Sequence, residues 1–267
     1  MIKTSTIFSL IALFLFANCD TKNNSNDMNI VAISNVKLEN LSKKKIYFGH
    51  QSVGYNLIDG LQDIIEKNQD SSIRIIEGND VELFNDPVIA HAQNGMNRDP
   101  NSKIKNFQQT LDKGLGNKVD IAGFKFCYVD FNKSTDVDEL FQHYKETMTE
   151  ISNEYPDISL VHFTVPLRTV QGGIKGPIKR IFSNDINLLE NEIRQKFNEM
   201  VVGYYDEESV FDIAKLESTF QNGKRNFKNV DGKRVYSMVS EYSNDGGHLS
   251  MIGKEYLGNE FLIFLTK

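Results

Sequence analysis

The chain has 267 residues, of which 40% are hydrophobic and 25% are charged, and its formal net charge at pH 7 is −6. This composition is that of a globular protein with a sizeable core, and α/β folds of this length often form a single domain. The sequence pI near 5.5 gives no general basic footprint, so nucleic acid is not expected as a partner.

The first residues have the features of a secretory signal. Lys3 gives a positive start, an apolar run extends from Ile7 to Phe16, and Ala17-Asn18-Cys19 follows. The run is too short for an ordinary membrane-spanning helix, which needs about 20 apolar residues. Cys19 stands where a bacterial lipoprotein carries its lipidated cysteine, although Asn18 departs from the usual small residue before it.

We therefore expect residues 1–18 to be a lipoprotein signal peptide that is cleaved before Cys19. The lipidated Cys19 would then anchor the protein in the bacterial cell envelope, on the periplasmic or cell-surface side. An ordinary signal peptide with an incidental cysteine is the alternative. Residues 20–27 are polar, as in a flexible tether, so residues 19–40 are predicted to form the lipidated cysteine and tether, and residues 41–267 the domain. With Cys19 lipidated, Cys127 has no cysteine to pair with and is expected to be a buried structural thiol.

The rest of the chain alternates strand-like and helix-like segments. Short apolar or β-branched runs predict strands at residues 44–48, 73–76, 119–129, 158–165 and 209–213. Apolar residues at helical spacing predict helices at residues 53–65, 104–115, 137–151, 186–200 and 251–265, and residues 85–100 are predicted to be a polar loop. Five strands with intervening helices predict an α/β fold with a mainly parallel sheet covered on both faces.

Candidate functional residues follow the predicted strands, where open α/β sheets gather their functional groups. Ser52 lies in a tight turn before a helix, whose free N–H groups favour the negative charge of an oxyanion. Near the other end of the chain, Asp245 precedes His248 by three residues, with two glycines between them. A serine nucleophile requires a base within hydrogen-bond reach and an acid that fixes the tautomer of that base.

On these motifs the chain resembles the SGNH/GDSL hydrolases over about residues 44–267. The resemblance implies a flavodoxin-like three-layer sandwich with a mainly parallel five-stranded sheet, and it implies that Ser52 is the nucleophile, His248 the base and Asp245 the acid. It also implies oxyanion donors after the second and third strands, where Gly95, Asn94 and Asn132 are the candidates.

Two blocks depart from the pattern of that family. The usual Gly-Asp-Ser is replaced by Gly49-His50-Gln51-Ser52, which places His50 and Gln51 next to the site as candidate substrate-binding residues. Where Gly-x-Asn-Asp is expected, the chain has Tyr128-Val129-Asp130-Phe131-Asn132. An ionised Asp130 in place of the asparagine would oppose an oxyanion, whereas Asn132 could donate to it.

The sequence therefore predicts a secreted, lipid-anchored serine esterase that hydrolyses acyl esters without cofactor or metal. The family resemblance adds carbohydrate-linked esters as a candidate substrate class. A non-catalytic carbohydrate-binding module and an acyltransferase are the alternatives. Metal-dependent hydrolysis through His50, Asp245 and His248 is less favoured, because no histidine pair has helical ligand spacing. Helix capping is the alternative role for Ser52, Asp245 and Ser250, and hydrogen bonding within the turn is the alternative for His50. His91 and Arg98 in the loop expected to approach the site, and Arg168, whose guanidinium could bind a carboxylate or a sugar, are expected on the solvated surface rather than at the substrate. His143 and His162 are expected in structural roles.

Overall fold

The structure is a computed structural model that describes residues 35–68, 72–170 and 186–267. The predictions for the signal peptide, for Cys19 and for the tether up to residue 34 lie outside the described residues. None of the helices within these ranges is long and apolar enough to cross a membrane.

A six-stranded parallel sheet forms the centre of the molecule, in the order β2-β3-β1-β4-β5-β6. Its strands are β1 (Lys45–His50), β2 (Ile75–Glu77), β3 (Val88–Gln93), β4 (Ile121–Phe124), β5 (Ser159–Phe163) and β6 (Val210–Phe211). The first strand is central, with Ile46 in register with Ile89 of β3 on one side and with Ile121 of β4 on the other. A strand buried on both faces needs a continuous apolar run, which explains why β1 and β4 can be recognised in the sequence.

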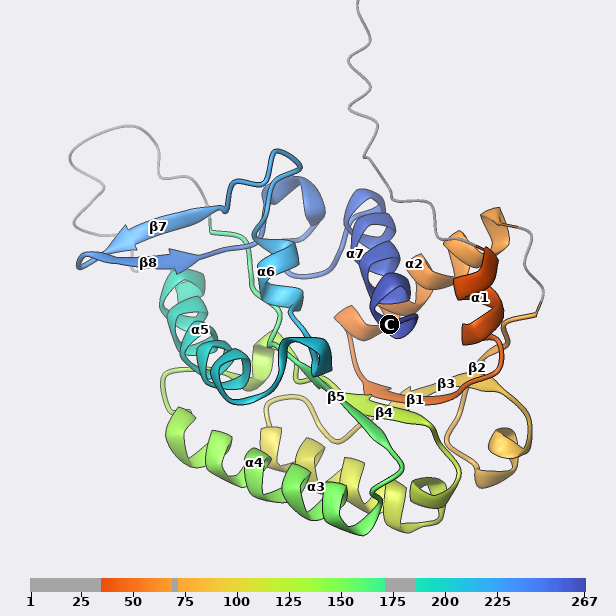
Figure 1. The fold of residues 1–267 in the computed structure, drawn as a ribbon. Helices are drawn as coiled ribbons and strands as arrows, with labels where there is room; N and C mark the ends of the chain where they lie inside the picture. Colours follow the sequence, from red (N-terminus) through yellow and green to blue (C-terminus); the bar gives the residue numbers. More distant parts are fainter. Residues whose placement is uncertain (1–34, 69–71, 171–185) are drawn as a thin grey trace, which may run out of the picture.

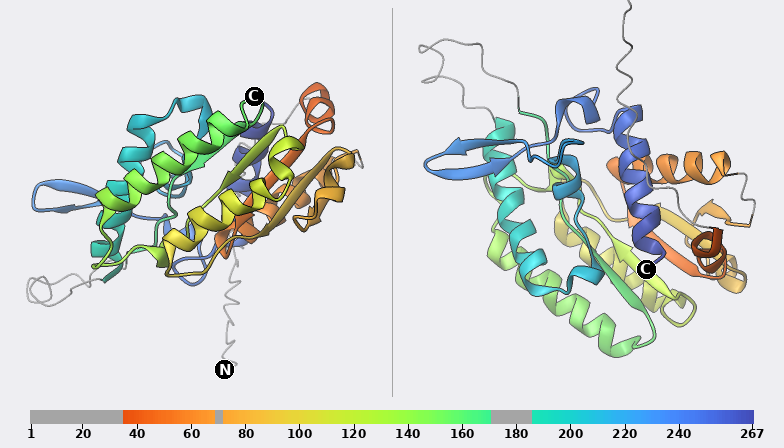
Figure 2. Two further views of the ribbon diagram at one scale, coloured as in Figure 1. Left: turned by 90° about the horizontal axis from the view of Figure 1, so that it is seen from below. Right: turned by 45° about the horizontal axis from the view of Figure 1, so that its top comes forward.

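Helices cover both faces of the sheet (Figures 1 and 2). One face carries α1 (Asn35–Leu41), α2 (Val53–Lys67) and α7 (Met251–Leu265), and the other carries α3 (Pro100–Asp112), α4 (Val137–Glu154) and α5 (Ile186–Tyr204). Each face has its own apolar core, and the short helix α6 (Ile213–Glu217) contributes to the first. The prediction of a three-layer α/β sandwich with a mainly parallel sheet is confirmed.

Smaller elements complete the described chain. A two-stranded antiparallel hairpin, β7 (Phe227–Val230) and β8 (Lys233–Tyr236), stands beside α5 and projects from the body of the molecule (Figures 1 and 2). The described 3₁₀ turns are η1 (Val81–Asn85), η2 (Leu115–Asn117), η3 (Tyr128–Asp130), η5 (Glu207–Ser209) and η6 (Ser240–Tyr242).

The predicted number of five strands is wrong, because the segment 85–100 contains strand β3 instead of being only a polar loop. The strand is Val-Ile-Ala-His-Ala-Gln, and its histidine interrupts an apolar run that is already short. In the sheet His91 is only 5% exposed and its ring contacts His50 of β1, so the surface role expected for His91 is wrong. A polar residue is accommodated inside a buried strand. The predicted strand at 119–129 is also too long, since β4 ends at Phe124.

Helix α1 forms in the segment before the predicted domain. Residues 35–40, predicted as part of a flexible tether, belong to this helix. Leu38 and Leu41 are each 2% exposed and pack into the core under α2 and α7. The packed structure therefore includes α1 as well as the predicted domain.

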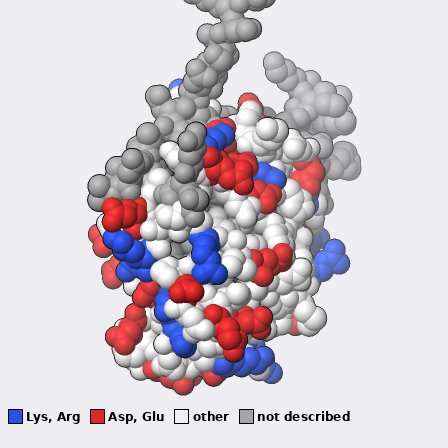
Figure 3. Space-filling model, turned by 90° about the vertical axis from the view of Figure 1, so that its right-hand side faces the viewer, with Lys and Arg blue, Asp and Glu red and all other residues white. Residues whose placement is uncertain are grey.

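The surface carries charges of both signs. The chain has 30 Lys and Arg against 36 Asp and Glu, and Figure 3 shows the two kinds interspersed on the face drawn there. Exposed pairs such as Lys67 with Glu255, 2.6 Å apart, contribute little to stability, because solvent screens them.

Candidate active site

Ser52 is held in the turn between β1 and α2. Its backbone has φ 53° and ψ −111°, a conformation that non-glycine residues rarely adopt. The turn is closed by hydrogen bonds from Gly54 N to Gln51 O (3.1 Å) and from Tyr55 N to Ser52 O (2.9 Å). The hydroxyl of Ser52 makes no capping hydrogen bond to α2, so the alternative that Ser52 serves as a side-chain helix cap is wrong.

The structure brings Ser52, His248 and Asp245 into one hydrogen-bonded chain. Ser52 Oγ lies 2.6 Å from His248 Nε2, across 196 residues of sequence, and His248 Nδ1 lies 2.6 Å from Asp245 Oδ2. A carboxylate at Nδ1 favours the tautomer with its proton there, which leaves the Nε2 lone pair to accept the serine proton. The three side chains thus have the connectivity of a nucleophile, a base and an orienting acid.

Asp245 is kept ionised by the turn that carries it. Burial alone would raise the pKa of Asp245, but hydrogen bonds from the His248 ring and from the backbone N–H groups of His248 and Gly247 hold that pKa well below its ordinary value. The side chain of Asp245 is 55% exposed and that of His248 is 44% exposed, so the pair is open to solvent and to substrate.

Other contacts fix the Asp245–His248 turn against α2 and α7. Gly246 has φ +85°, a left-handed conformation in which a side chain would be strained. Ser243 Oγ donates to His248 O (2.6 Å), and Leu249 N donates to Asn56 Oδ1 of α2 (3.0 Å). Ser250 caps α7 by accepting from Gly253 N (3.2 Å), which was its alternative role.

The candidate oxyanion donors point largely toward other protein groups. Asn94 is fully buried, with its amide N–H on Lys103 O (2.9 Å), and Gly95 N donates to Asn106 Oδ1 (3.2 Å). The amide of Gln51 donates to the carbonyls of Asn94 and Gly95, and therefore ties the Ser52 turn to the loop after β3. Asn132 accepts from Ser134 N (2.9 Å) in a turn of its own.

Asp130 is neutralised by a lysine that the sequence did not single out. Its Oδ2 accepts from Lys103 Nζ (2.6 Å) and Cys127 N (2.7 Å), and its Oδ1 accepts from Arg98 N (2.8 Å). Both side chains of the Lys103–Asp130 ion pair are fully buried. The carboxylate therefore joins the loops after β3 and β4 and is occupied by these donors.

His50 makes a structural pair with His91. Its Nε2 lies 3.0 Å from His91 Nδ1, and the side chain is completely buried. Burial, with smaller effects from the charges of Lys125 and His91, lowers the pKa of His50 to about 2, so the ring is neutral. A Cβ at Gly54 would come within 2.3 Å of His50, so the second residue of α2 has room only for glycine. His50 thus contacts His91 and not the Asp245–His248 pair, and within the described ranges no group of three His, Cys, Asp or Glu side chains is placed to hold a metal ion.

Two residues beside His248 escaped the sequence analysis as site residues. The ring of Tyr128 lies edge-on to the His248 ring, with centroids 5.9 Å apart. The guanidinium of Arg168 stands over the Tyr128 ring at 5.2 Å, and its Nε donates to Gly246 O (3.3 Å). The available signals were that Tyr128 occupies the block compared with Gly-x-Asn-Asp and that Arg168 follows the fourth predicted strand. The remaining histidines are structural: His162 contacts Tyr144 OH (2.8 Å), and His143 contacts Asn101.

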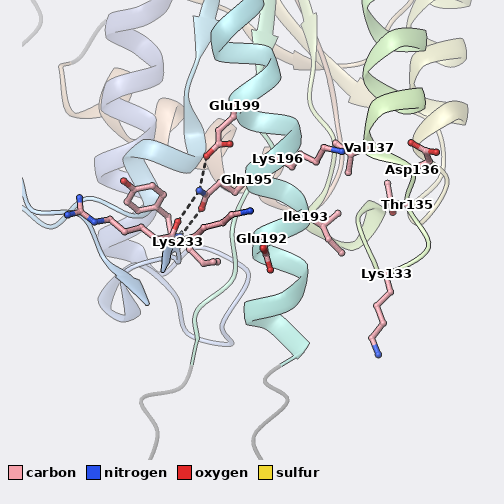
Figure 4. Close-up of a pocket in the computed structure, with 13 residues that line it drawn as sticks. Lys133, Thr135, Asp136, Val137, Glu192, Ile193, Gln195, Lys196, Glu199 and Lys233 are labelled. Atoms are coloured by element: carbon pink, nitrogen blue, oxygen red, sulfur yellow. Dashed lines mark hydrogen bonds between the residues drawn. The ribbon is translucent and has the colours of Figure 1, made fainter. Parts of the chain in front are cut away.

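A separate pocket of about 1010 Å³ lies between the start of α4, α5 and the β7–β8 hairpin (Figure 4). Its wall includes Gln195, which donates to Glu199 Oε1 (2.8 Å) and to Arg234 O (3.0 Å). None of the predicted site residues lines this pocket, so it is distinct from the site around Ser52.

Neither a protein-family model nor a curated protein matches the chain. Solved structures that it is similar to include the acetyl xylan esterase AlAXEase, with 15% identity over 81% of this chain and 97% of that one and a TM-score of 0.43. A protein of Desulfitobacterium hafniense DCB-2, whose name places it in the G-D-S-L family of lipolytic proteins, has 12% identity over 83% and 99% of the two chains and a TM-score of 0.45. The periplasmic domain of a lipopolysaccharide acetyltransferase of Salmonella ser. Paratyphi A has 12% identity over 88% and 90% and a TM-score of 0.45.

Of these neighbours, the Desulfitobacterium protein carries the name of the family that the sequence motifs resemble. With TM-scores below 0.5 and such low identities, they do not establish the activity of this chain.

Proposed function

We propose that the protein is a serine hydrolase of SGNH/GDSL type that cleaves acyl esters. The observation that carries the proposal is the hydrogen-bonded chain from Ser52 Oγ through the His248 ring to Asp245, with 2.6 Å at each step. The strained backbone of Ser52 adds support, since strain at a turn is retained where the surrounding structure enforces it, and functional sites are where such residues gather.

In the proposed reaction the Ser52 oxygen attacks the ester carbonyl while His248 Nε2 takes the serine proton. The carbonyl electron pair moves to oxygen and forms an oxyanion near the N-terminus of α2, where the helix dipole favours negative charge. Collapse of this intermediate breaks the bond to the alcohol, which leaves with the proton from His248. Water then attacks the acyl-serine by the same route, and the acid is released.

A non-catalytic binding module is less well supported. Such a module would not need a serine hydroxyl that is hydrogen-bonded to a histidine whose other nitrogen contacts a carboxylate. The intact hydrogen-bonded arrangement therefore favours catalysis. Transfer of the acyl group to an alcohol acceptor would use the same acyl-serine, and product analysis with added acceptors distinguishes it from hydrolysis.

Hydrolysis of a short aryl acetate by the purified protein tests the proposal. The Ser52→Ala and His248→Ala variants should lose activity by about 10³-fold or more, as expected when members of a triad are removed. Ser209→Ala, which removes a hydroxyl that donates to Asp206 O (2.8 Å) in η5, is the matched control and should keep wild-type activity. A fluorophosphonate should add one covalent label per chain to the wild type, detected by intact-mass measurement, and none to Ser52→Ala.

Labelling separates a poor substrate from a wrong mechanism. Wild-type protein that is labelled at Ser52 but leaves the aryl acetate intact is a serine hydrolase with a different ester preference. Hydrolysis that survives both Ser52→Ala and His248→Ala would contradict the proposed triad.

We also propose that the ester is presented at the cell envelope, on a carbohydrate, and that Cys19 carries the lipid anchor. These parts rest on the family resemblance of the motifs and on the signal-like sequence before Cys19. Metabolic labelling with a fatty-acid analogue tests the anchor: incorporation should disappear in Cys19→Ser, and labelling that persists in that variant would exclude lipidation at Cys19.

A further inference from the structure

An oxyanion in this site needs more than one hydrogen-bond donor. The backbone N–H of Ser52 has no acceptor among the described residues and is the first candidate. The amide groups of Asn94 and Gly95, expected as donors, are directed at Lys103 O and Asn106 Oδ1. Asn132 lies in a separate turn with Ser134. A second donor near Ser52 must therefore come from a residue other than Asn94, Gly95 and Asn132.

Tyr128 places a hydroxyl beside the reacting groups. Its ring is inclined by 72° to the His248 ring with centroids 5.9 Å apart, and a Cβ at Gly247 would come within 2.8 Å of the Tyr128 oxygen. Glycine at 247 is thus what lets the tyrosine approach the catalytic turn. The residue is only 8% exposed, and its hydroxyl interacts with the Ser52 hydroxyl.

The charge environment keeps this hydroxyl protonated and polarised. Burial raises the pKa of Tyr128, while the nearby Arg168 charge and hydrogen bonding with Ser52 oppose that rise. The phenol therefore carries its proton at neutral pH and lies within reach of the Ser52 hydroxyl. Arg168 stands 5.2 Å from the ring centre. Its positive charge stabilises negative charge on the phenol oxygen, and this makes the O–H a stronger hydrogen-bond donor.

The backbone around Tyr128 is fixed from the opposite side. The buried Arg194 donates through Nε to Tyr128 O (2.9 Å), and its own charge is paired with Glu190 at 2.7 Å. The 3₁₀ turn η3 that starts at Tyr128 is also held by Asp130, whose carboxylate accepts from Cys127 N (2.7 Å). The ring is therefore held in place before any substrate binds, as an oxyanion donor needs to be.

We propose that the Tyr128 hydroxyl is a catalytic oxyanion donor, which acts together with the Ser52 N–H in place of the asparagine side chain of the family pattern. This inference rests on the proposed function. As the Ser52 Oγ–carbon bond forms, the carbonyl π pair moves to oxygen and the serine proton moves to His248 Nε2. Tyr128 keeps its proton throughout and shares it with the developing oxyanion, so no additional reactant is required.

Replacement of Tyr128 by Phe removes this one O–H and leaves the ring in place. We expect kcat for the aryl acetate to fall by about 100-fold or more with KM changed only a few-fold, because loss of one oxyanion donor costs about 10²–10³ in kcat. The rate of Ser52 labelling by the fluorophosphonate should fall as well, since that reaction builds negative charge on the same oxygen. Tyr155→Phe, which loses a hydroxyl that contacts Asp112 (3.0 Å), is the matched control and should behave as wild type.

The pH dependence of activity with a fluorinated tyrosine at position 128 is a second test. A purely structural role of Tyr128 would leave this pH dependence unchanged. The fluorinated phenol is more acidic, so activity should be lost at a lower pH than in wild type, as the donor proton dissociates. An unchanged upper limb of the pH profile would overturn the inference.

The outcomes separate this inference from the proposed function. Wild-type protein that is neither labelled nor active would overturn both. Active wild type with a Tyr128→Phe variant within about threefold of its kcat would overturn the role of Tyr128 and leave the serine mechanism standing.

Discussion

Lys103 and Asp130 show how a single buried ion pair shapes the candidate site. The pair joins helix α3 to the turn η3, and the backbone of Lys103 also accepts from Asn94 and crowds Gly95, where a Cβ would lie 2.6 Å from Lys103 N. Gly95 has φ +61°, so glycine is required there by conformation as well as by space. The loop after β3 is therefore built around this lysine.

Lys103→Met should destabilise the protein strongly, because it leaves the Asp130 charge buried without its cation. Loss of one partner of a buried pair costs about 3–5 kcal/mol, which urea denaturation measures. Lys105→Met, at an exposed position of the same helix, is the control and should change the unfolding free energy by less than about 0.5 kcal/mol. The double variant Lys103→Met/Asp130→Asn should recover part of the loss; equal stability of the two single lysine variants would contradict the assignment.

At the scale of elements, α2 and α7 cross at a pair of glycines. A Cβ at Gly60 would lie 2.1 Å from Lys254 O, and a Cβ at Gly258 would lie 2.6 Å from the backbone of Gly60. Each helix accepts glycine in its interior at a cost of about 1 kcal/mol relative to alanine, and the close approach of the two backbones offsets that cost. This crossing carries the Ser52 turn and the His248 turn, since each lies at the start of one of the two helices.

Gly60→Ala is expected to force the helices apart and to destabilise the protein by about 1–3 kcal/mol, the usual range for overpacking. Gly203→Ala in α5 is an informative control, because nothing lies within 4 Å of its Cβ position and alanine is the better helix former. Thermal unfolding should therefore show a lower midpoint for the first variant and an equal or higher one for the second. A Gly60→Ala variant as stable as wild type would mean that the backbones of α2 and α7 are far enough apart to accept a methyl group at this position.

Helices and strands with a regular apolar pattern could be predicted from the sequence, and interactions between distant polar residues could not. The predicted helix at 53–65 is α2, and the predicted helix at 251–265 has the bounds of α7, because core-facing positions repeat along each. The Ser52, Asp245 and His248 group could be proposed because each residue follows a recognisable local pattern. By contrast, β3 contains His91, whose buried ring is paired with His50 of another strand. The buried carboxylate of Asp130 is paired with Lys103, 27 residues away. Neither contact has a local signature.

For the molecule as a whole, the buried carboxyl group of Glu217 makes stability depend on pH. Its side chain is fully buried at the end of α6, and its Oε2 accepts from Leu167 N (2.8 Å) in the segment that follows β5. Burial raises the pKa of Glu217 to about 8, while the hydrogen bond from Leu167 and the charges of Lys125 and Arg194 act in the opposite direction.

The sign of the resulting pH dependence follows from the raised pKa. Between the ordinary carboxyl value of 4.5 and about 8, Glu217 is protonated in the folded state and ionised in the unfolded state. The unfolded state therefore binds fewer protons, and stability falls as pH rises through this window, by up to about 1.4 kcal/mol per pH unit. The contribution of the protonated group is fully present below pH 4.5 and is lost as pH approaches 8.

Glu217→Gln should remove this dependence, because a neutral amide of the same shape can keep the bond to Leu167 N and does not titrate. Urea denaturation at a series of pH values between 5 and 8 should show the variant gaining stability relative to wild type as pH rises. Glu208→Gln, at an exposed position in η5, controls for loss of one negative charge and should run parallel to wild type. If the stability difference between Glu217→Gln and wild type stays constant over that range, Glu217 is ionised in the folded protein. The charge of Lys125 would then lower the pKa of Glu217 by more than burial raises it.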